Sequence, residues 1–419
     1  MPEKRRVVIT GIGIVSPVGN SRESTWNAVL KGESGVREIS IFDVHNFPCR
    51  IAGEVKNFDL DSIIPKEKKK LKKYIARGAG FGIAASYEAM EDAGLLESNN
   101  DRLGVCIGNS GQRAFLKDWG EIHKAYLEKF KTMPFINITD FLKNKYHTCA
   151  ELISIFHNAQ AFNYSISTAC ASGTQALGLA YRMIQGNQAD VVISGGCDSM
   201  INEIDLMSFC LLGAVTTEYN DNPQRGSCPF SKQRSGFVLG EGGAMLILEE
   251  LEHAIKRNAK IYGEVAGYGT TMSAYSLTDP PPNGEAAYSS MMAAIKDAKI
   301  DVKKIEYINA HGTSTRDNDL TETLSIKHLF EKYAYKIPVS STKSTTAHLI
   351  SGAGAIEAAF CALAIRDGKL PPTMNLLDAD GQCDLDYIPL KCRDKKIDCA
   401  LSNSLGFGGS NASIIIRRY

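Results

Sequence analysis

The stretch STACASG, residues 167–173 (Ser167-Thr168-Ala169-Cys170-Ala171-Ser172-Gly173), decides how this chain is organised. An apolar run, residues 161–166, precedes it, and residues 174–180 continue it with small and apolar side chains. A strand that ends in a tight turn of small residues and leads into a helix predicts an α/β fold. The turn places Cys170 at a helix N-terminus, where free amides and the helix dipole favour a thiolate. The sequence therefore offers a nucleophile, although a single cysteine is more often a small buried apolar residue.

The composition is that of an ordinary enzyme-sized globular protein. The chain has 419 residues, 44% of them hydrophobic and 22% charged, and its 47 Lys and Arg residues balance 47 Asp and Glu residues. Such a neutral balance gives no general attraction for nucleic acid. The 11 cysteines occur singly, with no close CxxC pair, and the charged N-terminal residues 3–6 are followed by no apolar signal segment. We expect a reduced, cytoplasmic protein with no membrane-spanning run.

An internal repeat supports a duplicated architecture. Residues 173–186 form a small-residue helix pattern closed by glycine, and residues 352–368 (GAGAIEAAFCALAIRDG) repeat this pattern after a second β-branched run. Cys170 stands just before the first copy, and His348 stands just before the second. Pseudo-symmetry would therefore bring both side chains to the N-termini of two paired central helices.

Other elements follow from periodicity and end signals. Ser24 is a candidate cap for a helix that stops at Gly32. Further strands are expected at residues 6–15, 102–107, 189–196 and 236–248, and an amphipathic helix is expected at residues 114–131.

Two histidines lie at strand ends among glycine, serine and threonine. His311 belongs to AHGTST (residues 310–315), and His348 belongs to KSTTAHL, in which Lys343 lies five residues upstream. A lone histidine is more often structural, and a lone lysine is more often solvent-exposed. A glycine turn, NSLGFGGSN (residues 403–411), is either a hairpin or a source of backbone amide donors.

A basic run, KEKKKLKKY (residues 66–74), precedes Arg77. Such a run is commonly a solvated helix face. Its excess of positive charge in a neutral chain leaves open a docking patch for an acidic partner.

Together these motifs resemble the β-ketoacyl-acyl-carrier-protein synthases of the synthase II type, in the thiolase superfamily. The similarity runs from Val7 to Ile416, and the motifs occur in the family's order. They are STACASG, GFVLGEG (residues 236–242), AHGTST, KSTTAHL and NSLGFGGSN. The resemblance implies a duplicated five-layer αβαβα fold, usually dimeric, with an N-terminal half (1–255) carrying the nucleophile and a C-terminal half (256–419) carrying the histidine pair.

The resemblance also implies roles for individual residues. Cys170 would accept the acyl chain as a thioester, while His311 and His348 would promote decarboxylation of a malonyl unit and stabilise the enolate. Lys343 would set the local field, and Glu322 would support the histidine network.

Further residues would bind the substrate and its carrier. The amides of Cys170 and Phe407 would form the oxyanion hole, and Phe407 would gate the acyl pocket. The implied substrate-binding residues are Thr313, Thr315, Phe209, Phe230 and Thr278. The implied docking residues for an acyl carrier protein are Lys69, Lys70, Lys73 and Arg77. Neither a metal nor a separate cofactor is expected, because the substrates are carried on the phosphopantetheine arm of the carrier.

Several positions depart from the family pattern. Ala347 stands where a glycine is usual, and Leu405 stands where a phenylalanine is common. Residues 228–231 (CPFS) and Arg234-Ser235 lack the arginine and aspartates usual in that loop. Residues 108–113 (GNSGQR) replace a bulky aliphatic residue that often closes the acyl pocket.

Three alternatives remain. A non-catalytic partner subunit, like the chain-length factor that forms heterodimers with some ketosynthases, would lack the nucleophile. A degradative thiolase would carry a second cysteine where this chain has NSLGFGGSN. Within ketosynthases, the segment 315–319 with Glu322-Thr323 favours type II polyketide synthesis over housekeeping fatty-acid elongation, whereas residues 409–411 are closer to the fatty-acid enzymes.

Overall fold

In the computed structural model, residues 4–98, 101–111, 120 and 138–419 are described. The helix predicted at residues 114–131 lies outside the described residues, apart from Gly120. Within the described part, no helix is long and apolar enough to cross a membrane.

Ten of the described strands form one large mixed sheet with two halves. The order is β10-β9-β13-β14-β8-β1-β7-β6-β4-β5. One half contains β1 (Val7–Val15), β4 (Leu103–Gly108), β5 (Asn163–Ile166), β6 (Val191–Ser199) and β7 (Glu241–Glu250). The other half contains β8 (Gly263–Met272), β9 (Tyr307–Asn309), β10 (Val339–Ser340), β13 (Cys399–Leu405) and β14 (Ser410–Arg417). The halves meet where β1 pairs antiparallel with β8, at Val8–Glu264 and Ile9–Gly263.

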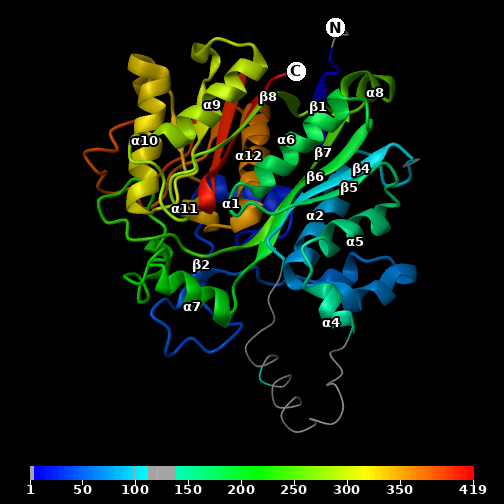
Figure 1. Cartoon of the computed structure of the whole chain (residues 1–419), viewed down its shortest axis with the longest axis horizontal. Helices are drawn as coiled ribbons and strands as arrows, with labels where there is room; N and C mark the ends of the chain where they lie inside the picture. Colours follow the sequence, from blue (N-terminus) through cyan, green and yellow to red (C-terminus); the bar gives the residue numbers. More distant parts are fainter. Residues whose placement is uncertain (1–3, 99–100, 112–119, 121–137) are drawn as a thin grey trace.

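Helices lie between the two halves and on their outer faces (Figure 1). The central helices α6 (Ser172–Gln185) and α12 (Ala353–Asp367) contact strands of both halves. Helix α2 (Arg77–Asp92) and helix α5 (Thr148–His157) cover the outside of the first half. Helix α9 (Glu285–Ala298) covers the outside of the second half, with α10 (Arg316–Phe330) against it. This arrangement is the expected five-layer αβαβα fold.

Small residues let the two central helices meet at their N-termini. A Cβ atom added at Gly173 would lie 2.7 Å from the carbonyl oxygen of Ser351, and one added at Gly354 would lie 2.1 Å from Thr174 Oγ1. Residues 353–365 of α12 are all buried. A helix enclosed by two half-sheets and another helix has no solvent face, which explains its alanine-rich sequence. The predicted pairing of the two repeats is confirmed.

The remaining elements frame the ends of the sheet. Ser21, and not Ser24, is the N-cap of α1; Ser24 is the third helical residue and completes a capping box with it. The other helices are α1 (Arg22–Lys31), α4 (Ile138–Lys143), α7 (Glu203–Leu211), α8 (Leu251–Lys256) and the short α11 (Lys343–Thr346). Minor strand pairs are β2 (Val36–Glu38) with β3 (Ile51–Gly53), and β11 (Lys369–Leu370) with β12 (Arg393–Asp394). The basic run forms the 3-10 segment η2 (Lys66–Tyr74), and the glycine turn contains η7 (Phe407–Gly409).

Candidate active site

A cavity of about 270 Å³ opens beside the N-termini of the two central helices. Cys170, His311 and His348 line it together with Phe407 and Phe237. The cavity therefore joins the ends of segments that lie far apart in the sequence.

The turn before α6 is built to present Cys170. Ala169 adopts a left-handed backbone conformation, with φ of 49°. The Ser172 hydroxyl donates to the Ala169 carbonyl at 2.6 Å and accepts from the Thr168 amide at 2.8 Å. These bonds hold an unfavourable conformation at the residue before Cys170, a feature typical of functional turns.

The sulfur of Cys170 contacts His348. The distance from Sγ to Nε2 is 3.0 Å. The amide of Ile350 donates to Nδ1 of His348 at 3.3 Å. Because Nδ1 accepts this bond, the ring proton of neutral His348 lies on Nε2, which points at the sulfur.

His311 stands next to His348 at the end of β9. The two ring centroids are 5.3 Å apart, with the planes nearly perpendicular at 82°. Glu322 on α10 accepts from the amides of His311 and Gly312, each at 2.8 Å, and from Nδ2 of Asn403 at 3.1 Å. Glu322 therefore orients the histidine through its backbone, as a buried carboxylate that fixes the turn.

Lys343 forms a buried ion pair with Glu357. The lysine and glutamate side chains are 2% and 1% exposed, and Nζ bonds to Oε1. Burial raises the pKa of Glu357 to about 7, although Lys343 opposes this shift. The pair connects the loop before His348 to the interior of α12.

Burial favours the neutral forms of Cys170, His311 and His348. It raises the pKa of Cys170 to about 12, while Lys343 and the amides of Phe407 and Cys170 act in the opposite direction. It also holds the pKa values of His311 and His348 well below the usual 6.5, and Lys343 lowers both further. The helix terminus thus faces a protonated thiol in the resting site, and the thiolate expected from the turn alone is outweighed by burial.

The glycine turn between β13 and β14 brings backbone amides to the sulfur. The backbone amides of Phe407 and of Cys170 itself lower the pKa of the thiol and so oppose the effect of burial. Gly408 has φ of 81°, a conformation that favours glycine, and its amide donates to the Leu277 carbonyl at 2.7 Å. The geometry brings together the two predicted oxyanion-hole donors, and the Phe407 ring lines the cavity.

Three of the predicted substrate-binding residues line the cavity. Thr313 and Thr315 hydrogen-bond to each other through their hydroxyls at 2.9 Å, and Thr278 lies on an exposed loop at the rim. Two predicted residues do not line it in the described structure. Phe209 packs edge-on against Phe237, which takes the place at the wall, and Phe230 is fully buried and stacks on Tyr387 with centroids 3.8 Å apart.

The basic run divides into anchored and exposed lysines. Lys68 donates to the carbonyls of Ile155 and Phe156 at 2.9 and 2.6 Å, which fixes the run to α5. Lys69, Lys70 and Lys73 are exposed.

Arg77, which was also predicted as a docking residue, forms an ion pair with a buried glutamate. Its guanidinium binds both carboxylate oxygens of the fully buried Glu241 and the Val55 carbonyl. Because that ion pair compensates a buried charge, Arg77 is a structural residue at the start of α2.

Sequence reasoning missed Glu357, Phe237 and Asp198. Glu357 and Asp198 are buried acids beside the site, and burial raises the pKa of Asp198 to about 6. The sequence does mark Glu357, because it is the one charged residue in the apolar run 353–365. Such a residue needs a buried partner.

The side chains of Cys170, His311 and His348 also form a possible donor set for a metal. One atom each from Cys170, His311 and His348 lie within 4.8 Å of one another. Sulfur and imidazole donors suit zinc. They equally suit the nucleophile and hydrogen-bond donors of an acyl-transfer site.

The comparisons identify relatives over the whole chain. "Beta-ketoacyl synthase, N-terminal domain" matches residues 4–254, and "Beta-ketoacyl synthase, C-terminal domain" matches residues 262–377. The chain is 42% identical to the 3-oxoacyl-[acyl-carrier-protein] synthase 2 of Synechocystis sp., over 100% of this chain and 99% of that protein. It is also 42% identical to the enzyme of the same name from Coxiella burnetii, over 99% of each chain.

Solved structures share the fold. A beta-ketoacyl synthase from Burkholderia phymatum superposes with a TM-score of 0.89 at 32% identity, over 99% of this chain and 100% of that one. A type II polyketide synthase complex, in which an acyl-carrier protein is bound to its ketosynthase carrying the hexaketide, gives a TM-score of 0.86 at 33% identity, over 100% of each chain.

Proposed function

The chain belongs to the beta-ketoacyl synthase family, whose members build fatty acids or polyketides by condensation, and we propose that Cys170, His311 and His348 divide this reaction between them. Cys170 holds the growing acyl chain, and the histidines act on the malonyl unit. The single observation that carries this division is the 3.0 Å contact between Cys170 Sγ and His348 Nε2, with His311 beside it.

The first step is acyl transfer. Cys170 sulfur attacks the carbonyl carbon of the acyl thioester, a new thioester forms, and the old carbon–sulfur bond breaks. The thiol proton passes to the released carrier thiol, so the step consumes no net proton. The negative charge that develops on the carbonyl oxygen is stabilised by the amides of Cys170 and Phe407.

The second step makes the carbon nucleophile. Loss of carbon dioxide from the malonyl thioester leaves an enolate, and its oxygen accepts hydrogen bonds from His348 Nε2–H and a ring nitrogen of His311. The low pKa values of both histidines support this role, because a neutral imidazole donates to the oxygen without protonating it. The enolate carbon then attacks the acyl carbonyl, a carbon–carbon bond forms, and the carbon–sulfur bond to Cys170 breaks. Cys170 leaves as a thiolate and takes one proton from solvent water.

The substrates arrive on an acyl carrier protein. The pantetheine arm enters the cavity past Thr313 and Thr315, whose hydroxyls hydrogen-bond to its amides. The exposed Lys69, Lys70 and Lys73 attract the acidic carrier. The related polyketide ketosynthase in complex with its carrier supports this proposal.

A second copy of this chain, or a homologous partner, completes the molecule. Strand β5 ends the described sheet, and Tyr164 on it is 42% exposed. An open edge strand with an exposed aromatic side chain favours pairing with another chain. Tyr164→Lys should convert a dimer into a monomer in light scattering, and an unchanged mass would contradict pairing through this edge.

Product analysis tests the function and separates the two pathways. The purified protein, given an acyl-carrier and a malonyl-carrier, should release carbon dioxide and form a β-ketoacyl-carrier two carbons longer. If no product forms while the substrates stay intact, the proposed function is contradicted. That result would instead favour the non-catalytic alternative, a partner subunit like the chain-length factor. We keep the prediction of polyketide synthesis, for which poly-β-keto products are expected. Fatty-acid elongation is the second candidate, favoured by the 42% identity over the whole chain to 3-oxoacyl-[acyl-carrier-protein] synthase 2.

A further inference from the structure

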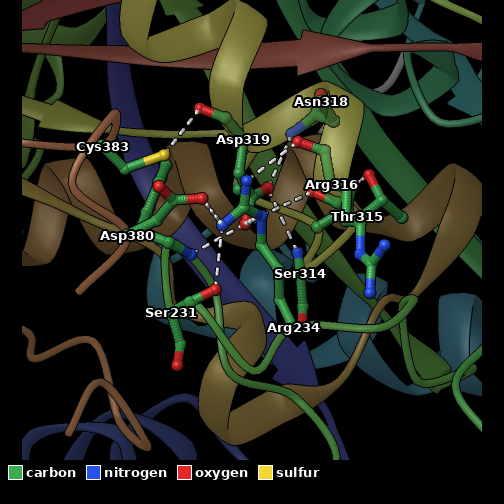
Figure 2. Close-up of polar contacts among 12 residues, drawn as sticks. Ser231, Arg234, Ser314, Thr315, Arg316, Asn318, Asp319, Asp380 and Cys383 are labelled. Carbon is green, nitrogen blue, oxygen red and sulfur yellow. Dashed lines mark hydrogen bonds and ion pairs between the residues drawn. The ribbon is translucent and has the colours of Figure 1, made fainter. Parts of the chain in front are cut away.

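Thr313 and Thr315 line one side of the cavity, called here the threonine wall. A charged cluster of Arg234, Asp319 and Asp380 lies next to Thr315, and Figure 2 shows its polar contacts. Arg234 contacts Asp380 through Nη1 at 2.7 Å, and its Nε lies 3.8 Å from Asp319 Oδ2. The side chains of Arg234 and Asp319 are 4% and 0% exposed. None of the three residues lines the cavity in the described structure. The reaction described above leaves this cluster without a role.

Arg234 binds the backbone that carries the threonines. Its Nε donates to the Thr315 carbonyl at 3.2 Å, and its Nη2 donates to the Arg316 carbonyl at 3.1 Å. A third bond runs from Nη1 to the Ser231 carbonyl at 2.9 Å. The planar guanidinium therefore joins the turn at residues 313–316 to the loop that departs from the family pattern at residues 228–231.

Asp319 holds two strained residues at once. Its carboxylate accepts from the Phe230 amide at 2.8 Å and from the Ser314 amide at 3.2 Å. Phe230 and Ser314 both have left-handed backbones, with φ of 63° and 70°. Residues other than glycine persist in this conformation only where their surroundings hold them there. Ser314 lies between Thr313 and Thr315, so its conformation sets the direction of both hydroxyls.

We propose that Arg234 and Asp319 are positioning residues that fix the Thr313–Thr315 wall for the pantetheine arm. The inference rests on the proposed function, because it takes these threonines as the residues that bind the arm. The cluster does not touch the substrate. It acts through the turn, whose carbonyls are held by Arg234 and whose central amide is held by Asp319.

Acylation of Cys170 by two thioesters tests this role. Acyl-pantetheine carries the arm, whereas the acyl thioester of thiophenol has none. Arg234→Lys keeps the charge but loses the planar fork. It should lower the second-order rate constant for acyl-pantetheine on the order of tenfold, mainly through a higher half-saturation concentration. The rate constant for the thiophenyl ester should stay within about twofold of wild type, because that ester never meets the threonine wall.

Three further variants make the test specific. Arg225→Lys, three residues before the loop at residues 228–231 and bonded weakly through its side chain to Gln233 at 3.3 Å, is the matched control and should change neither rate constant. Asp380→Asn removes a partner that is 23% exposed, so it should fold and show a smaller loss of the same kind. The double variant Arg234→Lys/Thr315→Val should lower the rate constant for acyl-pantetheine no more than the more damaging single substitution does. The reason is that both substitutions act through one contact.

The outcomes separate the inference from the function. Equal losses with both thioesters, or no loss with acyl-pantetheine, would overturn the positioning role. If the double variant Arg234→Lys/Thr315→Val shows the sum of the two single losses in the rate constant for acyl-pantetheine, Arg234 does not act through Thr315. A wild-type protein that neither thioester acylates at Cys170 would instead contradict the proposed function itself.

Discussion

Cys170, the proposed nucleophile, has surroundings that oppose its ionisation. The residue is only 6% exposed, and burial raises the pKa of its thiol to about 12. Lys343 and two backbone amides favour the thiolate, but they do not cancel the loss of solvation. We therefore expect the sulfur to stay protonated until a thioester reaches the amides proposed to stabilise the developing charge.

This environment predicts how alkylation of Cys170 depends on pH. Only the thiolate reacts with iodoacetamide, and at a pH well below the pKa the thiolate fraction rises about tenfold per pH unit. We expect the alkylation rate to rise in this way from pH 7 to pH 9, as followed by mass spectrometry of the Cys170 peptide. Cys170→Ala gives the background from the other cysteines. A rate that is constant above pH 7 would show a thiolate already formed at neutral pH.

At the scale of elements, the loop carrying His348 is held by close packing on glycines. Ala347 has φ of 60° and ψ of −174°, a region that favours glycine. His348 forms a bridge with Leu239, and its carbonyl accepts from the Gly240 amide at 2.9 Å. A Cβ added at Gly53 in β3 would lie 2.8 Å from the Ala347 methyl group. Gly53 thus makes room for the alanine that departs from the family pattern.

A paired substitution tests this packing. Gly53→Ala should lower the free energy of unfolding by roughly 1–3 kcal/mol, because the new methyl group overlaps that of Ala347. Adding Ala347→Gly should restore part of the loss, since it removes one of the two methyl groups. Gly381→Ala is the control, because its Cβ would meet nothing within 4 Å. Denaturant unfolding measures all four proteins, and a double variant no more stable than Gly53→Ala would contradict the proposed overlap.

The same scale shows what the sequence could predict. The repeat placed Cys170 and His348 at the starts of α6 and α12, because small-residue helices and strand ends are local patterns. Contacts between distant segments were not readable. Arg77 meets Glu241 across 164 residues, and Phe230 is drawn into the core by Tyr387. Neither contact leaves a local pattern in the sequence. Arg77 was therefore assigned to the docking surface because it follows a basic run, and Phe230 was assigned to the substrate pocket.

At the scale of the whole molecule, charge is balanced overall and uneven locally. The chain has a formal net charge of +0, yet η2 presents Lys69, Lys70 and Lys73 to solvent. Lys68 fixes this segment to α5 through two carbonyl bonds, so the exposed lysines are held on an ordered surface. A rigid basic surface on a neutral protein can steer an acidic carrier without attracting anions everywhere.

Charge reversal tests this docking surface. The double variant Lys69→Glu/Lys70→Glu should raise KM for malonyl-carrier roughly tenfold at low salt, because attraction becomes repulsion. The salt dependence of KM should flatten or reverse. Lys303→Glu/Lys304→Glu makes the same change in net charge at two other exposed lysines and should leave KM unchanged. Equal KM values for malonyl-carrier in the two double variants would indicate that the basic run is an ordinary solvated surface and not a docking site.

The most direct test follows acylation and decarboxylation separately in one protein. Wild-type protein incubated with acyl-carrier should gain one acyl group, mapped to Cys170, and should lose it when malonyl-carrier is added, with release of carbon dioxide. His348→Ala should still form the adduct but release little carbon dioxide, whereas Cys170→Ala should form no adduct and no condensation product. An adduct on another residue, condensation by Cys170→Ala, or decarboxylation that survives in His348→Ala would contradict the division of labour between this cysteine and this histidine.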